Sequence, residues 1–175
     1  MWPIQFTINQ HFMKIILLGY MGSGKSTVAQ ELAAALDLPF TDLDDYITEQ
    51  ENMSLKDIFK AKGEIYFRRK ETEILFEILQ SNSSMVLSTG GGTPCYGSNM
   101  DKLLNHEEVI TIYLKSSVMT LTDRLFKETE TRPLIDHLDT EKELQEFIGK
   151  HLFERAPIYE RSQIIVDTTN LSASE

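Results

Sequence analysis

Five short apolar runs recur along the chain, separated by longer segments in which apolar residues return every three or four positions. The runs are continuous rather than alternating, which is typical of parallel strands covered on both faces. Strands that alternate with helices predict a doubly wound α/β domain with a buried sheet, whose ligands bind beyond the carboxyl ends of the strands. The predicted strands are Lys14–Leu18, Pro39–Thr41, Met85–Ser88, Val109–Leu114 and Gln163–Val166.

Helix signals lie between these runs. Apolar residues from Val28 to Leu36 have helical spacing, and so have those of 65–79 and 117–126. Ser54 and Thr140 are each followed three residues later by an acidic residue, which predicts capping boxes at the start of two further helices.

The composition fits one globular domain. A chain of 175 residues with 41% apolar residues can bury a single substantial core. We expect this domain to span 13–175, after an N-terminal extension at 1–12. The single cysteine, Cys95, excludes an internal disulfide, and no apolar stretch reaches the ~20 residues of a membrane span. A cytoplasmic protein with no membrane partner is therefore expected. We also expect a monomer.

Charge narrows the class of ligand. The formal net charge is −10, and the acidic residues are spread along the chain. Such a surface repels nucleic-acid phosphates, so nucleic acid is not an expected partner. An anionic substrate must be held by a local group of basic side chains.

A phosphate-binding loop follows the first predicted strand. Gly19 to Ser26 reads GYMGSGKS and satisfies GxxxxGK[ST] between a strand and a helix, as the motif requires. The glycines let backbone N–H groups face the phosphates, and the helix adds its positive end. Lys25 is expected to neutralise the β and γ oxygens, and Ser26 to offer a hydroxyl to Mg²⁺. The residues expected to bind ATP here are Gly22, Ser23, Gly24, Lys25, Ser26 and Thr27.

Two carboxylates follow the second predicted strand. Asp42 and Asp44 would point to the same side of an extended segment, at the edge of the sheet where chemistry occurs. Asp42 can serve the metal in place of a Walker-B aspartate, which the third strand lacks at its tip. Asp44 can orient an acceptor hydroxyl and accept its proton. The alternative is that Asp44 or Asp45 only caps a helix.

The third predicted strand runs into three glycines, Gly90 to Gly92. Without side chains, their backbone N–H groups can donate to an anion. A flexible turn is the alternative.

Three arginines are candidates for holding anions. Arg68 has Glu71 three residues later on the same helix face, where the carboxylate can brace a guanidinium fork. Arg132 lies in a polar stretch that reads as a lid, and it can reach the γ-phosphate when that lid closes and excludes water. Arg155 precedes Pro157, which is expected to end a helix there. The alternatives are a solvated helix charge, an ordinary surface loop and compensation of a helix C-terminus.

Taken in order, these motifs resemble those of the shikimate kinase family. The segments GYMGSGKS, DLD, GEIYFRRKE, STGGGTP, RPL and ERAPIY extend over nearly all of 14–169. The resemblance implies a P-loop three-layer α/β/α fold of the nucleoside monophosphate kinase type, with a five-stranded parallel sheet and a mobile lid at about 127–140. It further implies a Mg²⁺-dependent enzyme of aromatic amino acid biosynthesis that transfers the γ-phosphate of ATP to the 3-hydroxyl of shikimate.

The resemblance assigns a role to each matching position. The catalytic residues it implies are Lys25, Asp44 and Arg132. To the ATP-binding loop it adds Arg124 near the adenine and Arg132. The substrate-binding residues are Asp44, Arg68, Gly90, Gly91, Gly92 and Arg155, and the metal-binding residues are Ser26 and Asp42.

The chain departs from the family pattern at both ends. It begins about a dozen residues before the first strand and leaves little for a final helix after the last one. We expect a core face or the adenine pocket to be less covered, and stability to be reduced before chemistry is lost. The competing functions are another small-metabolite kinase of this fold, such as a gluconate kinase or a nucleoside monophosphate kinase, and a non-catalytic nucleotide-binding module.

Overall fold

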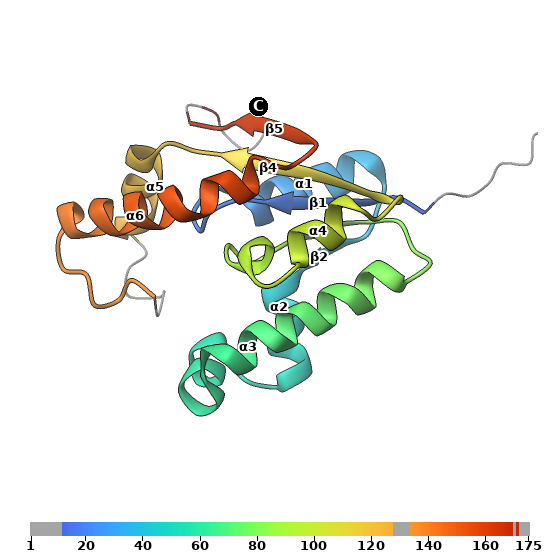
Figure 1. Ribbon diagram of the computed structural model, residues 1–175, viewed down its shortest axis with the longest axis horizontal. Coiled ribbons are helices and arrows are strands. Elements are labelled where there is room, and N and C mark those ends of the chain that lie inside the picture. The colour runs from blue at the N-terminus through green and yellow to red at the C-terminus, as the bar shows by residue number, and fades with distance from the viewer. Residues whose placement is uncertain (1–11, 128–133, 170, 172–175) are drawn as a thin grey trace, which may run out of the picture.

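The computed structural model describes residues 12–127, 134–169 and 171. Five strands form one parallel sheet in the order β2-β3-β1-β4-β5. Figure 1 shows the strands together with the helices that surround them. The strands are β1 (Lys14–Leu18), β2 (Phe40–Asp42), β3 (Met85–Ser88), β4 (Val109–Lys115) and β5 (Ile164–Asp167).

Helices cover both faces of the sheet and make three layers. Alternate residues of β1 pack in opposite directions, because successive side chains of a strand point to opposite faces. Ile15 and Leu17 pack with α1, whereas Ile16 and Leu18 pack with α2, α3 and α4. The helices are α1 (Lys25–Leu36), α2 (Leu43–Glu51), α3 (Leu55–Gln80), α4 (Asn99–Leu104), α5 (Val118–Leu125) and α6 (Glu141–Tyr159), with a 3₁₀ turn, η1 (Thr93–Cys95).

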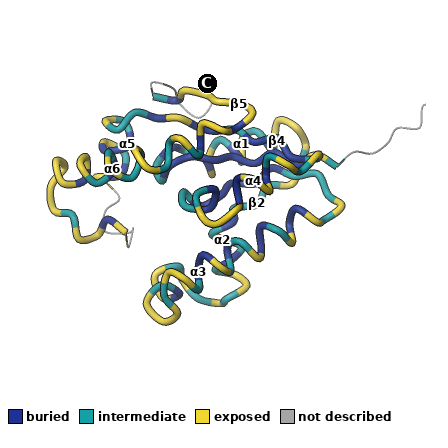
Figure 2. Tube along the Cα trace, viewed as in Figure 1, coloured by how far each residue is buried: buried dark blue, intermediate teal, exposed yellow. Residues whose placement is uncertain are grey.

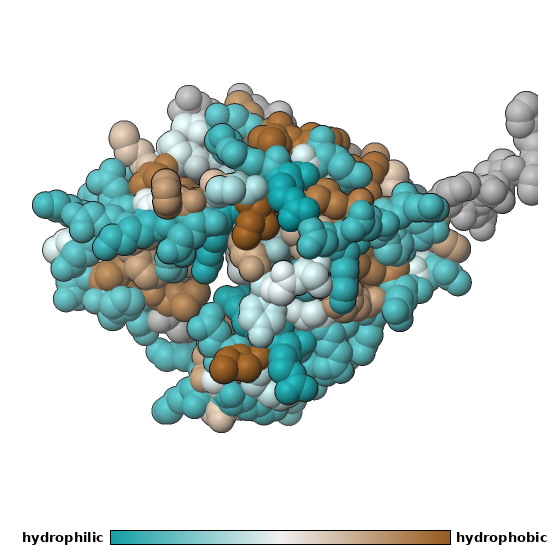
Figure 3. Space-filling model, in the orientation of Figure 1, coloured by the Kyte–Doolittle hydropathy of each residue, from teal (hydrophilic) through white to brown (hydrophobic). Residues whose placement is uncertain are grey.

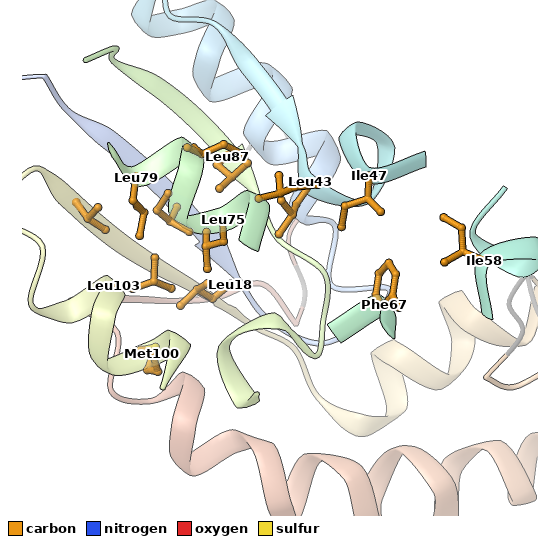
Figure 4. Packing of buried hydrophobic residues seen from close by; sticks show 14 residues of the cluster. Leu18, Leu43, Ile47, Ile58, Phe67, Leu75, Leu79, Leu87, Met100 and Leu103 are labelled. Atoms are coloured by element: carbon orange, nitrogen blue, oxygen red, sulfur yellow. The ribbon is translucent and has the colours of Figure 1, made fainter. Parts of the chain in front are cut away.

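The largest apolar cluster lies between β1, β3 and the helices α2, α3 and α4. Leu18 and Leu87 enter it from the sheet, and Leu43, Leu75 and Leu103 enter it from three different helices (Figure 4). Each of these side chains is fully buried. Burial of this kind stabilises by roughly 1.5–3 kcal/mol per large apolar side chain, so the cluster fixes α2 and α3 against the sheet.

The sheet is not buried throughout, contrary to the expectation from the sequence. All of β1 is buried, whereas all of β5 is exposed, including Ile164 at 44% and Ile165 at 47% (Figure 2). The reason is position, because β5 is an edge strand that pairs with β4 and lies away from α1, which packs on β1, β2 and β3.

The two predicted caps, at Ser54 and Thr140, are present, and Ser117 forms a third that was not predicted. Thr140 and Glu143 form a full capping box, and the hydroxyls of Ser54 and Ser117 accept from backbone N–H groups three residues on. The segment opened by Ser54 continues into the predicted 65–79 helix as α3, with a kink at Gly63, whose φ of 81° is not helical.

The prediction that Pro157 ends a helix is wrong. Helix α6 continues through it to Tyr159. Proline removes one N–H and crowds the carbonyl of the preceding turn, which here belongs to Phe153. Phe153 is 86% exposed, so that carbonyl is near solvent and the interruption is tolerated close to the helix end.

The described residues include no helix that is long and apolar enough to cross a membrane.

Candidate functional site

The phosphate loop joins the buried strand β1 to α1. Gly24, the residue before α1, has a φ of 88°, a left-handed conformation that favours glycine. A Cβ on Gly19 would lie 2.8 Å from the carbonyl oxygen of Leu114, so the loop is packed closely against β4. The Lys25 side chain is only 8% exposed, and its Nζ donates to the carbonyl of Tyr20 at 2.9 Å. The Lys25 side chain is therefore held in place by the backbone of its own loop.

Oxygen ligands gather beside this loop. Ser26 Oγ donates to Asp42 Oδ2 at 2.6 Å and lies 3.3 Å from the hydroxyl of Ser88. The register that pairs Asp42 with Ser88 places these two residues at the carboxyl ends of adjacent strands. Hard oxygen donors at the end of a phosphate loop suit Mg²⁺.

Asp42 has a second role, and it corrects the sequence interpretation of the acidic pair. Its Oδ1 accepts from the backbone N–H of Asp44 at 3.0 Å, so Asp42 is the N-cap of α2, and neither Asp44 nor Asp45 is. Asp44 lies in the first helical turn rather than in an extended segment. The two carboxylates are nevertheless close enough for Asp42 to raise the pKa of Asp44.

Asp44 has the most perturbed carboxyl group of this site. The residue is partly exposed, but its Oδ1 is enclosed and lacks a hydrogen-bond partner among the described residues. Burial, followed by the negative charges of Glu71 and Asp42, raises the pKa of Asp44 to about 7, although the positive charges of Lys25 and Arg68 oppose the shift. A carboxyl with a pKa near 7 suits proton transfer at neutral pH.

A cavity of about 470 Å³ brings the phosphate loop and the acidic pair together. Arg124 of α5 also lines it, and its Nη1 donates to the carbonyl of Gly22 at 3.2 Å. Thr168 and Leu171, which follow the exposed strand β5, were not predicted because no motif distinguishes them. The predicted residues that line this cavity are Gly22, Ser23, Gly24, Lys25, Ser26, Thr27, Asp42, Asp44, Gly90, Gly91 and Arg124.

Arg68 and Glu71 form the ion pair that their spacing predicts. Arg68 Nη1 donates to Glu71 Oε2 at 2.9 Å, and the two side chains are 10% and 0% exposed. Glu64 lies one turn before, 3.5 Å from Arg68 Nε. A buried guanidinium with a fixed carboxylate partner is held in one orientation.

A second cavity, of about 290 Å³, lies between α3 and α6 and contains both Arg68 and Arg155. Figure 3 shows the surface hollowed between α6 and the first part of α3. The Arg155 guanidinium carbon lies 5.8 Å from the centre of the Tyr20 ring, so Arg155 also reaches the phosphate loop. Two residues of this cavity that the sequence did not single out are Cys95 and Glu154.

The glycine turn borders both cavities. A Cβ on Gly90 would lie 2.5 Å from Glu71 Oε1 and 2.9 Å from Asp44 Oδ1, and a Cβ on Gly92 would lie 2.6 Å from the guanidinium of Arg68. The phenol of Tyr159 donates to the carbonyl of Gly91. The glycine turn is thus packed between Asp44 on one side and Arg68 on the other, and it is not a flexible turn.

The expected lid at about 127–140 is described only in part. Arg132 and the rest of 128–133 lie outside the described residues, whereas 134–140 are described and contain turns. The extension expected at 1–12 also falls almost entirely outside the described residues.

The phosphate loop lies at the carboxyl edge of a parallel five-stranded sheet, and the neighbouring cavity between α3 and α6 contains a buried arginine, Arg68. This combination defines a P-loop kinase. The family model described as shikimate kinase matches residues 21–175. The chain belongs to the shikimate kinase family.

Individual relatives agree with this assignment. The shikimate kinase of Flavobacterium johnsoniae is 47% identical over 162 residues, which cover 93% of each chain. The crystal structure of shikimate kinase from Bacteroides thetaiotaomicron has a TM-score of 0.80 and 35% identity, covering 89% of this chain and 86% of that one. The structure of shikimate kinase from Acinetobacter baumannii in complex with shikimate has a TM-score of 0.80 and 31% identity, covering 93% and 87%.

Proposed function

We propose that the chain transfers the γ-phosphate of ATP to the 3-hydroxyl of shikimate, giving shikimate 3-phosphate and ADP. The observation that carries the proposal is the arrangement of two cavities that both border the glycine turn. One contains Lys25 and Asp44, and the other contains Arg68 and Arg155. Shikimate has a carboxylate at one end and hydroxyls at the other, which matches this order of charges.

ATP lies along the phosphate loop. Lys25 neutralises the β and γ oxygens, together with backbone N–H groups and the positive end of α1. Arg124 lies near the adenine of ATP, consistent with its position on α5 and its hydrogen bond to the carbonyl of Gly22. Ser26 and Asp42 would hold Mg²⁺, since their neighbouring oxygen atoms are the hard donors that this ion prefers. When bound, Mg²⁺ offsets the negative charge of the phosphates.

The acceptor lies across the glycine turn. Arg68 and Arg155 donate to its carboxylate, and the backbone of Gly91 and Gly92 lines the site between that carboxylate and the phosphate loop. Asp44 accepts a hydrogen bond from the 3-hydroxyl and takes its proton as the phosphoryl group transfers. Activity then rises as Asp44 ionises near pH 7.

Arg132 approaches the γ-phosphate from a lid at about 127–140, which excludes water from the transferred group. We further propose a cytoplasmic monomer, with ATP and shikimate as its ligands and without nucleic acid or membrane partners.

The test is a panel of acceptors with Mg²⁺-ATP. Shikimate should be phosphorylated at its 3-hydroxyl, as phosphorus NMR of the product would reveal, and gluconate and nucleoside monophosphates should not be turned over at comparable rates. Faster transfer to gluconate would favour the second candidate, a gluconate-kinase-like enzyme. Nucleotide binding without transfer to any acceptor would indicate a non-catalytic module.

A further inference from the structure

A chain of buried hydrogen bonds extends from α4 through η1 to the ion pair of α3. Asn99 Nδ2 donates to the carbonyl of Thr93 at 2.8 Å and lies 3.1 Å from the hydroxyl of Thr72. The Thr93 hydroxyl in turn donates to Glu71 Oε1. Thr93 and Glu71 are completely buried, and Asn99 is 1% exposed, so solvent does not compete for these bonds.

The two oxygens of Glu71 therefore have different partners. Oε2 accepts from Arg68, and Oε1 accepts from Thr93. A carboxylate can pair with a guanidinium through both of its oxygens, which would occupy one full side of the fork. Because Thr93 occupies Oε1, Glu71 holds Arg68 through a single oxygen and leaves further N–H donors of the fork for a ligand.

The Thr93 bond also affects the side of Glu71 that faces the acidic pair. Glu71 Oε1 and Asp44 Oδ1 both come within 3 Å of the point where a Cβ on Gly90 would lie, at 2.5 and 2.9 Å. Thr93 donates to this same oxygen of Glu71, so it also fixes the position of Oε1 beside Asp44 Oδ1, which has no hydrogen-bond partner among the described residues. The other charged groups that face Asp44 are Asp42, Lys25 and Arg68.

We propose that Thr93 is a positioning residue of the substrate site, which orients Glu71 so that Arg68 presents free donors to the carboxylate of the acceptor. The proposal rests on the proposed function, in which Arg68 binds that carboxylate. Asn99 fixes the backbone of Thr93 and so acts one step further from the ligand.

The test is the variant Thr93→Val, which keeps the shape of the side chain and removes its hydroxyl. We expect the KM for shikimate to rise on the order of tenfold, the usual effect of losing a hydrogen bond to a charged group. The KM for ATP should stay within about twofold. Thr93→Ser, which keeps the hydroxyl, should restore the KM for shikimate.

A matched control separates positioning from stability. Thr111 is another fully buried threonine, near the amino end of β4, and its hydroxyl bonds with Gln163. Thr111→Val should lower the melting temperature without moving either kinetic value. If it raises the KM for shikimate as much as Thr93→Val does, general destabilisation is the cause and the proposal is overturned. If Thr93→Val does not fold, Thr93→Ala replaces it with the same expected results.

Arg68→Ala, measured in parallel, distinguishes the two possible failures. An unchanged KM for shikimate in Thr93→Val, with a raised KM in Arg68→Ala, would overturn the role of Thr93 alone. An unchanged KM in both variants would overturn the arginine clamp of the proposed function as well.

Discussion

Arg68 and Glu71 are bound to each other at 2.9 Å with almost no access to solvent, at 10% and 0% side-chain exposure. Two charges withdrawn from water are costly unless each is paired, so neither is expected in a purely structural helix. The pair stands between the cavity of the phosphate loop and the cavity between α3 and α6. Its position explains why a strongly acidic chain can hold an anionic acceptor.

Removal of the arginine should weaken acceptor binding specifically. In Arg68→Ala we expect kcat/KM for shikimate to fall by about 100-fold or more, since a charged, partly bidentate contact is lost, with the KM for ATP little changed. The variant should also be less stable by about 3–5 kcal/mol, because Glu71 is left buried without its cation. Steady-state kinetics with both substrates and urea unfolding measure these effects.

Arg69 provides the control for this prediction, since it is the neighbouring residue on α3 and is exposed. Arg69→Ala should leave both kinetics and stability near those of the unaltered chain. An unchanged affinity for shikimate in Arg68→Ala would remove the arginine from the substrate site.

Loss of the Asp44 carboxylate should affect turnover more than nucleotide binding. Asp44→Asn keeps the shape of the side chain but cannot accept the hydroxyl proton, so we expect kcat to fall by about 10²–10⁴. The dissociation constant for ATP, measured by calorimetry, should stay within a few-fold. The exposed neighbour Asp45 gives a matched variant, Asp45→Asn, which should retain its turnover. Near-normal turnover in Asp44→Asn would exclude Asp44 as the base or orienting group.

The raised pKa of Asp44 also has a consequence for stability. Its folded value of about 7 lies above the ordinary value of 3.8, so the folded chain holds this proton more tightly than the unfolded chain does. The contribution of the group to stability is complete below pH 3.8 and is lost as the pH rises through 7. Asp44→Asn, which cannot ionise, should therefore be more stable than the unaltered chain at pH 8, by at least about 1 kcal/mol.

At pH 4 the same comparison should show little difference, because Asp44 is then protonated in the folded chain. Urea unfolding at the two pH values measures both effects. If the two chains differ in free energy of unfolding by the same amount at pH 4 and at pH 8, folding does not raise the pKa of Asp44.

A methyl group on the glycine turn should displace the arginine. The Cβ of Gly92→Ala would lie 2.6 Å from the Arg68 guanidinium, which must then move. We expect the KM for shikimate to rise by about tenfold or more with little change for ATP. Gly149, within α6, has open space around its Cα, so Gly149→Ala should keep the kinetics and stabilise by about 0.5–1 kcal/mol. Equal effects of the two substitutions on the KM for shikimate would contradict the packing of the turn against Arg68.

The sequence predicted the parts of the fold that depend on local pattern. The strands β1 and β3 have the predicted bounds, and the five-stranded parallel sheet, the family and the enzyme class are confirmed. Continuous apolar runs and a phosphate loop carry their own signal, because their geometry is set within a few residues.

The remaining features depend on contacts that are distant in sequence. The short helices α2 and α4 were not predicted, since α2 begins with the acidic residues that were interpreted as an extended segment. The bond from Thr93 to Glu71 joins residues 22 positions apart, and that from Tyr159 to Gly91 joins residues 68 apart. No local spacing reveals such pairs, and the exposure of β5 likewise follows from its place at the edge of the sheet.

The most direct test of the account is the release of ADP by the purified chain with Mg²⁺-ATP, measured with and without shikimate. The account predicts a slow basal rate and a large, saturable increase when shikimate is added. ATP binding without any increase would contradict it, and would show that the hollow between α3 and α6 receives a different acceptor.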